Sequence, residues 1–257
     1  MSRDKVVPSA AEAVADIESG ASLAVGGFGL VGIPWSLIEA LLVQGADDLT
    51  VVSNNCGVDG AGLGLLLEQQ RITRVIASYV GENKEFARQY LSGELTVELT
   101  PQGTLAERMR AGGAGVGAFF TPTGVGTMVS EGGLPWRYHP DGSVALASEP
   151  KEVRTFHGKE MVLEESIVTD VALVRAAVAD RAGNCVFHAS ARNFNVPAAM
   201  AGRLTLVEAE EVVEVGEIGP DDVHLPGVFV QRVVELTPEQ ATHKDIEKRT
   251  TRTRVEA

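Results

Sequence analysis

A glycine-rich loop near the start of the chain constrains the fold more than any other feature. Residues 26–34 read Gly-Gly-Phe-Gly-Leu-Val-Gly-Ile-Pro, with an apolar run, 23–25, before them and an amphipathic segment, 34–42, after them. Proline is favoured in the first turn of a helix, and glycine adopts positive φ angles that let backbone N–H groups approach a ligand. The pattern predicts a strand, a binding loop and a helix. The residues of this candidate binding loop are Gly26, Gly27, Phe28, Gly29, Leu30, Val31 and Gly32.

The segment from Gly27 to Gly32 also matches the G-x-G-x-x-G pattern of dinucleotide-binding folds. In those folds the helix begins inside the glycine motif, and an acidic residue at the end of the second strand binds a ribose. Here Pro34 places the helix start after the motif, and the next predicted strand, 49–53, ends in Asn54-Asn55. These two differences argue against an NAD or FAD site.

Composition excludes several classes of protein. The 257 residues are 44% hydrophobic and carry a formal net charge of −13, which disfavours nucleic acid as a partner. No apolar stretch is long enough to span a membrane. Cys56 and Cys185 are too few for a disulfide framework, and the five histidines show no metal-ligand spacing. We expect a cytoplasmic protein with neither a metal site nor a permanently bound cofactor.

Helices and strands alternate through the first half of the chain. Ser9 and Glu12 predict a capped first helix that ends at Gly20. The patterns then predict strands at 22–26, 49–53, 73–80, 95–100 and 117–120, and helices at 34–44, 62–70, 83–92 and 103–111. Repeated strand–helix–strand units are typical of an α/β fold, here a mainly parallel open sheet flanked by helices.

The second half differs. Two predicted hairpins, 136–146 and 153–163, indicate a small β-rich insertion at about residues 125–165. Apolar runs at 170–178 and 203–209 predict two neighbouring buried strands. We expect one domain over residues 1–240, followed by a polar, solvated tail at 241–257.

Each unusual loop of the first half follows a predicted strand. These loops are 26–32, 54–57, 81–83, 100–103 and 121–124. Because ligands bind at the carboxyl edge of an open parallel sheet, the five loops predict a single crevice.

Together these loops resemble the class I coenzyme A-transferases, and within that family the α subunits of the 3-ketoacid type. The resemblance rests on the glycine loop, on Asn54-Asn55-Cys56-Gly57, on residues 78–83 and 98–108, on 119–127 and 131–133, and on Ser190-Ala191-Arg192-Asn193-Phe194-Asn195. It extends from about residue 5 to 235 and implies a coenzyme A thioester as substrate.

The resemblance also implies that the nucleophilic glutamate lies on a separate β subunit, in a Glu-Asn-Gly context that this chain lacks. Glu82-Asn83-Lys84 has only the first two residues, and Glu131-Gly132-Gly133 is a second imperfect match. We interpret both glutamates as loop carboxylates. The implied partner is therefore a β subunit, in a heterodimer or an α2β2 assembly.

For this chemistry, Gln102 is the candidate oxyanion donor, because its neutral amide can donate a hydrogen bond without titrating. Asn54 and Asn55 are candidates for orienting the carboxylate or the thioester, although turn formation alone could account for them. Cys56 and Phe28 are expected to pack in the interior and beneath the loop, respectively. Arg192 and Asn193 could contact the partner chain or simply lie on the surface.

The acid pair stays open at this point: succinate with acetoacetate is favoured, with 3-oxoadipate or acetate as alternatives. Sugar-phosphate isomerases and effector-sensing domains are suggested for the same fold family. An isomerase needs cations in the crevice loops, but loops 26–32, 54–57, 81–83 and 100–103 contain no Lys or Arg. A sensor would normally bring a DNA-binding segment, which the acidic N-terminal helix does not supply.

Overall fold

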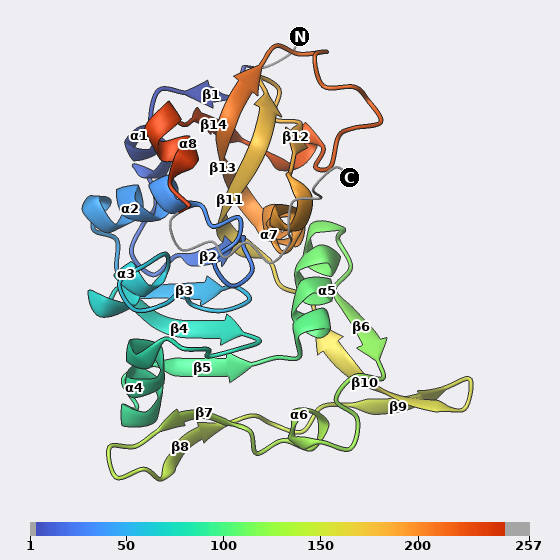
Figure 1. Cartoon of the computed structure of the whole chain (residues 1–257). Coiled ribbons are helices and arrows are strands. Elements are labelled where there is room, and N and C mark those ends of the chain that lie inside the picture. The colour runs from blue at the N-terminus through green and yellow to red at the C-terminus, as the bar shows by residue number, and fades with distance from the viewer. Residues whose placement is uncertain (1–3, 245–257) are drawn as a thin grey trace, which may run out of the picture.

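The computed structural model describes residues 4–244, and its centre is a nine-stranded sheet in the order β1-β14-β13-β11-β2-β3-β4-β5, with β12 beside β11 (Figure 1). Every neighbouring pair in that order is parallel, and only β12 is antiparallel to β11. The α/β fold class, with a mainly parallel open sheet, is thereby confirmed. The strands are β1 (Val6–Val7), β2 (Ser22–Val25), β3 (Leu49–Val52), β4 (Ile72–Ala77), β5 (Thr96–Leu99), β11 (Thr169–Asp180), β12 (Cys185–Val186), β13 (Gly202–Val213) and β14 (Arg232–Glu235).

Helices cover both faces of this sheet. On one face α1 (Ala10–Val14), α2 (Trp35–Gln44), α3 (Gly64–Glu68) and α4 (Lys84–Ser92) share a core with Leu23 and Val25. On the other, α5 (Gln102–Gly113) and α7 (Asn195–Ala201) pack with Ala24 in a second core. Successive residues of β2 therefore point into different cores, as the period of a strand requires. Burial on both faces explains why the strands of this sheet are apolar runs.

The strand order reverses direction between β2 and β11. From β2 the chain proceeds through β3, β4 and β5 on one side, whereas β11, β13 and β14 extend the sheet on the other side. Such a switch point leaves a crevice at the carboxyl ends of the two central strands. The glycine loop begins directly after β2, and a pocket of about 120 Å³ lined by Val31, Gly32 and Arg175 lies at this point.

The β-rich insertion is present and begins earlier than expected. β6 (Ala118–Thr121) pairs antiparallel with β10 (Lys159–Glu165), and β10 also pairs with β9 (Val153–Phe156). The predicted hairpins are found as β9–β10 and as β7 (Pro135–Tyr138) with β8 (Val144–Ala147); a short helix, α6 (Met128–Glu131), precedes β7. The expectation that 117–120 extends the parallel sheet was wrong. Loop 121–124 therefore does not belong to the carboxyl edge of the parallel sheet.

Two helix ends also differ from expectation. The Ser9 hydroxyl accepts the Glu12 N–H at 3.2 Å, as an N-cap should, but α1 already ends at Val14 and Gly20 occupies a later turn. The third helix starts at Gly64 and not at 62, because Gly60 and Gly62 adopt positive φ in a turn before it.

The expected polar tail is not wholly solvated. The last described helix, α8 (Pro238–Thr242), is followed by His243, whose ring lies 5.0 Å from that of Trp35, and by Lys244, which pairs with Glu210 at 2.7 Å. Residues 241–244 therefore pack on the body of the protein, and the remainder of the predicted tail, 245–257, lies outside the described residues. Two short 3-10 turns, η1 (Ala189–Arg192) and η2 (Gly227–Phe229), complete the described elements.

Candidate active site at the carboxyl edge of the sheet

The backbone of the glycine loop forms a tight, hydrogen-bonded turn. Phe28 N–H donates to Val31 O at 3.1 Å and Val31 N–H donates back to Phe28 O at 3.0 Å. Gly27, Gly29 and Gly32 have φ values of 102°, 59° and 74°. Other residues rarely adopt these angles, so the glycines are needed for this turn.

Asn195 holds the loop from below. Its side chain is fully buried and donates to Gly32 O at 3.0 Å and to Ala191 O at 2.8 Å, while its Oδ1 accepts the Arg175 N–H at 3.0 Å. A Cβ on Gly26 would lie 2.0 Å from Asn195 Oδ1, so only glycine fits there. This role of Asn195 could not be predicted from the sequence, because no local pattern sets Asn195 apart from other asparagines.

A buried carboxylate, Glu208 of β13, secures the helix that follows the loop. Glu208 is fully buried, and its Oε2 accepts the Leu37 N–H in the first turn of α2 at 3.0 Å. Arg175 lies 3.4 Å from the other oxygen of Glu208 and also donates to Glu210 and to Ala241 O. Burial raises the pKa of Glu208 to about 7, against the opposing effects of Arg175 and the backbone N–H groups of Leu37 and Ser36. The carboxyl group therefore links β11, β13 and α2 beneath the glycine loop.

The three polar candidates of the next loops do come together. Gln102 Nε2 donates to Asn54 Oδ1 at 2.9 Å, although the two residues are 48 positions apart. Asn54 and Asn55 are 3% and 6% exposed, whereas Gln102, the first residue of α5, lies on the surface. Ser78, which directly follows β4, donates to the same Asn54 oxygen at 2.9 Å. The structure thus places a cluster of neutral amides with one exposed member at the edge of the sheet.

The other candidates are placed as follows. Phe28 was expected to pack beneath the loop, but its side chain is 44% exposed and its ring lies 6.5 Å from that of Phe194. The expectation was wrong because Phe28 begins the tight turn and points outward from it. Cys56 is fully buried, and burial raises the pKa of its thiol, as expected for a packed residue. Asn193 donates to Val31 O at 3.0 Å and so supports the loop, whereas Arg192 is exposed.

The two glutamates of the imperfect motifs are exposed. Asn83, next to Glu82, caps α4 by accepting the Phe86 N–H at 2.8 Å and donates to Cys56 O at 2.8 Å, so this segment has a clear structural role. Glu131 ends α6, within the insertion. Between residues 4 and 244 no three or more His, Cys, Asp or Glu residues form a group that could hold a metal ion. Over the same range, none of the helices is long and apolar enough to cross a membrane.

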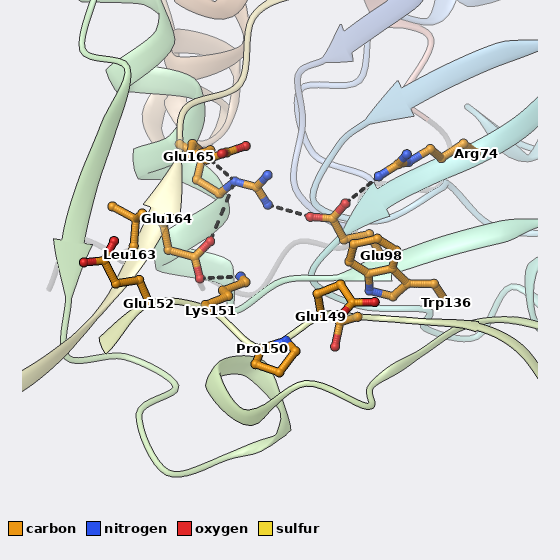
Figure 2. Close-up of a pocket in the computed structure, with 12 residues that line it drawn as sticks. Arg74, Glu98, Trp136, Glu149, Pro150, Lys151, Glu152, Leu163, Glu164 and Glu165 are labelled. Carbon is orange, nitrogen blue, oxygen red and sulfur yellow. Dashed lines mark hydrogen bonds and ion pairs between the residues drawn. The ribbon is translucent and has the colours of Figure 1, made fainter. Parts of the chain in front are cut away.

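A network of ion pairs anchors the helix that carries Gln102. These ion pairs line a pocket of about 440 Å³. In Figure 2 Glu98 is directed toward Arg74, and Lys151 toward Glu164. Arg108 of α5 pairs with Glu98 at 2.7 Å and lies 3.9 Å from Glu164, whose side chain is 1% exposed. Burial opposes ionisation of Glu98, but Arg108 and Arg74 prevail and hold its pKa below the usual range. The ion pairs of Glu98 and Glu164 thus join β5, α5 and the insertion.

With the crevice defined, comparison with known proteins identifies the family. The family model described as coenzyme A transferase matches residues 7–236, and the chain belongs to that family. A Mycobacterium tuberculosis protein, named as one subunit of a probable succinyl-CoA:3-ketoacid coenzyme A transferase, is 62% identical over 249 residues, which cover 97% of this chain and 99% of that protein. A Bacillus subtilis protein of the same name is 55% identical, covering 96% and 94%.

A longer relative and a solved structure add to this. The human mitochondrial succinyl-CoA:3-ketoacid coenzyme A transferase 2 is 56% identical over 233 residues, 91% of this chain but only 45% of that protein. The crystal structure of glutaconate coenzyme A-transferase from Acidaminococcus fermentans has a TM-score of 0.74 at 23% identity, over 93% of this chain and 77% of that one. The Acidaminococcus fermentans structure is thus similar to this chain in fold.

We predict that Arg108→Met destabilises the protein by about 2–4 kcal/mol, because it removes the most buried cation of the network and leaves Glu98 only with Arg74 and Glu164 only with Lys151. Chemical denaturation measures this change. Arg110→Met is the matched control, since Arg110 forms only an exposed pair with Glu107 on the same helix and its loss should change stability little. Equal effects of the two substitutions would contradict the proposed anchoring.

A second prediction concerns pH. Because the pKa of Glu208 is raised in the folded state, the folded protein binds more protons than the unfolded chain between about pH 4.5 and 7. This contribution to stability is complete below pH 4.5 and is lost as pH rises through 7, with a slope of at most about 1.4 kcal/mol per pH unit. Glu208→Gln should remove this component from the pH dependence of the unfolding free energy, and an unchanged profile would refute the assignment.

Proposed function

We propose that this chain is the α subunit of a coenzyme A-transferase that moves coenzyme A from succinyl-CoA to a 3-oxoacid such as acetoacetate. The observation that carries the proposal is the 62% identity to one named subunit of a probable succinyl-CoA:3-ketoacid coenzyme A transferase, over nearly the full length of both chains. The crevice adds support, since a glycine loop with an exposed to half-buried tip, Phe28 to Val31, and a cluster of neutral amides suit a thioester and its oxyanions.

The reaction needs a second subunit. We infer that a β subunit supplies the nucleophilic glutamate, in a heterodimer or an α2β2 assembly. The human relative supports a second subunit, because this chain matches only 45% of that protein and the rest is long enough to contain another subunit. Within this chain, Asn83 has a capping role beside Glu82, and Glu131 lies in the insertion.

The chemistry proceeds by covalent catalysis in two half-reactions. The partner's glutamate attacks the thioester carbonyl of succinyl-CoA and expels the coenzyme A thiolate, leaving a mixed anhydride. The thiolate attacks the glutamyl carbonyl of that anhydride, releases succinate and forms a glutamyl-CoA thioester. The carboxylate of the 3-oxoacid then attacks this thioester, and the same steps in reverse produce the 3-oxoacyl-CoA.

Each step passes through a tetrahedral species with negative charge on a former carbonyl oxygen. In this proposal the exposed amide of Gln102 donates to that oxygen. Asn54 and Asn55, on the buried side of Gln102, orient the Gln102 amide. In the glycine loop, Gly26 to Gly32, the N–H groups of Gly26, Phe28 and Val31 bond within the protein, so the backbone N–H groups of Gly29 and Leu30 at the tip receive part of the thioester or carboxylate. The acids 3-oxoadipate and acetate stay as alternative substrates, whereas a nicotinamide dinucleotide or sugar-phosphate function is not favoured. A cytoplasmic location and the absence of a permanently bound cofactor stay predictions.

The test of this function is reconstitution. The purified chain alone should show no coenzyme A transfer, and addition of its β subunit should restore transfer from succinyl-CoA to acetoacetate. A panel of acids that includes 3-oxoadipate and acetate identifies the preferred acceptor by kcat/KM. Transfer by the chain alone would overturn the two-subunit proposal and make Glu82 the first residue to replace.

The glycine loop gives a separate prediction. Gly29→Ala adds a Cβ that meets no neighbouring atom, yet forces a non-glycine residue to a φ of 59° at the turn. We expect at least a ten-fold loss of transfer with assembly and unfolding midpoint nearly unchanged, because the loop distorts without a clash in the core. Gly133→Ala is the control, since it too has positive φ (84°) and an open Cβ position but lies in the insertion. If both variants retain full activity, the loop does not bind substrate.

A further inference from the structure

The amide cluster ends on a group that cannot change its hydrogen-bonding role. Asn55 Nδ2 donates to Gly57 O at 3.3 Å, and Asn54 Nδ2 donates to Asn55 Oδ1 at 3.3 Å. Gln102 Nε2 then donates to Asn54 Oδ1 at 2.9 Å. A backbone carbonyl accepts hydrogen bonds and never donates them.

This fixed acceptor determines the direction of the whole series. If the amide of Gln102 were reversed, Asn54 would have to present its Nδ2 to Gln102 and its Oδ1 to Asn55. Asn55 would then present its Nδ2 to Asn54 and its oxygen to Gly57 O, and two acceptors would face each other. Only one orientation of all three amides satisfies every contact.

Ser78 strengthens that orientation at the middle amide. Its hydroxyl lies 2.9 Å from Asn54 Oδ1 and 3.1 Å from Asn54 O, and its own N–H donates to Asn54 O at 3.0 Å. Asn54 O thus already has a donor, so the hydroxyl hydrogen is best used at Asn54 Oδ1. Asn54 Oδ1 then accepts from both Ser78 and Gln102, and its position as acceptor is fixed from two sides.

We propose that Ser78 and the Gly57 carbonyl are positioning groups that orient the side-chain amide of Gln102 through Asn54 and Asn55. Gln102 commits one Nε2 hydrogen to Asn54 and keeps the second as a directed donor at the exposed end of the series. An oxyanion there meets an N–H whose direction is set before the substrate binds, which is the condition for electrostatic stabilisation. The orientation follows from the contacts alone, and its catalytic consequence rests on the proposed transferase function.

The orientation is tested by NMR on the isotopically labelled full chain. The hydrogen of Gln102 Nε2 that is bound to Asn54 should exchange with water more slowly than the free one. Asn55→Asp places an acceptor opposite Gly57 O, and Ser78→Ala removes one donor to Asn54. In each variant the ratio of the two exchange rates should fall at least three-fold. Ser78→Thr keeps the hydroxyl and should preserve the difference. Thr73→Ala removes a hydroxyl at the other end of β4, where it bonds Asp48, and should leave the Gln102 signals unchanged. Unaltered Gln102 exchange in both Ser78→Ala and Asn55→Asp would overturn the proposal.

Kinetics on the assembled two-subunit enzyme test the consequence. Gln102→Ala should lower kcat about ten- to a thousand-fold, the scale of one lost oxyanion donor. Ser78→Ala should lower kcat about three- to ten-fold with little change in KM, and Ser78→Thr should restore most of it. In the Gln102→Ala background, Ser78→Ala should have no further effect on kcat, because its contribution passes through the missing amide. Independent, multiplicative effects would show that Ser78 does not act through Gln102. If the assembly transferred no coenzyme A at all, the proposed function would fail while the NMR result still decided the orientation.

Discussion

The buried side chain of Asn195 is the interaction on which the arrangement of the crevice depends. It joins the glycine loop, the turn at Ala191 and the backbone of β11 by three hydrogen bonds. These groups lie on either side of the point where the strand order reverses, so the Asn195 side chain connects the two halves of the sheet at that point. Leaving a buried amide without hydrogen-bond partners costs free energy. The three hydrogen bonds therefore hold the three segments in one relative position. Beside it, Arg175 extends the same contact to Glu208 and through it to the start of α2.

The fold was predictable to a large degree because its signals are local. Apolar runs separated by glycine punctuation define a parallel sheet, and the rule that ligands bind at its carboxyl edge locates the crevice. By the same rule Asn54 and Gln102 could be expected near each other, and the structure places them in contact. The roles assigned to these residues nevertheless come from family resemblance and stay predictions.

What the sequence did not predict depends on contacts between distant residues. The hydrogen bonds from Asn195 to Gly32 and from Leu37 to Glu208 span 163 and 171 positions, and no local pattern announces them. β6 was misplaced for a related reason: Phe119 and Phe120 suit any sheet, and their actual partner is the distant strand β10, which pairs with β6 through residues 162–165. The outward orientation of Phe28 follows from the geometry of a turn, which hydrophobicity does not encode.

The amide cluster has a consequence for how such an enzyme responds to its surroundings. Asn54, Asn55, Ser78 and Gln102 have no proton to gain or lose in the physiological range, and their series ends on a backbone carbonyl. In the proposed function, the hydrogen bonds that this cluster offers to an oxyanion are therefore insensitive to pH as long as the chain stays folded. Any sharp pH optimum in turnover would then originate in the nucleophile, in the acids it exchanges, or in Glu208 beneath the glycine loop, whose pKa of about 7 sets it apart from the neutral amides.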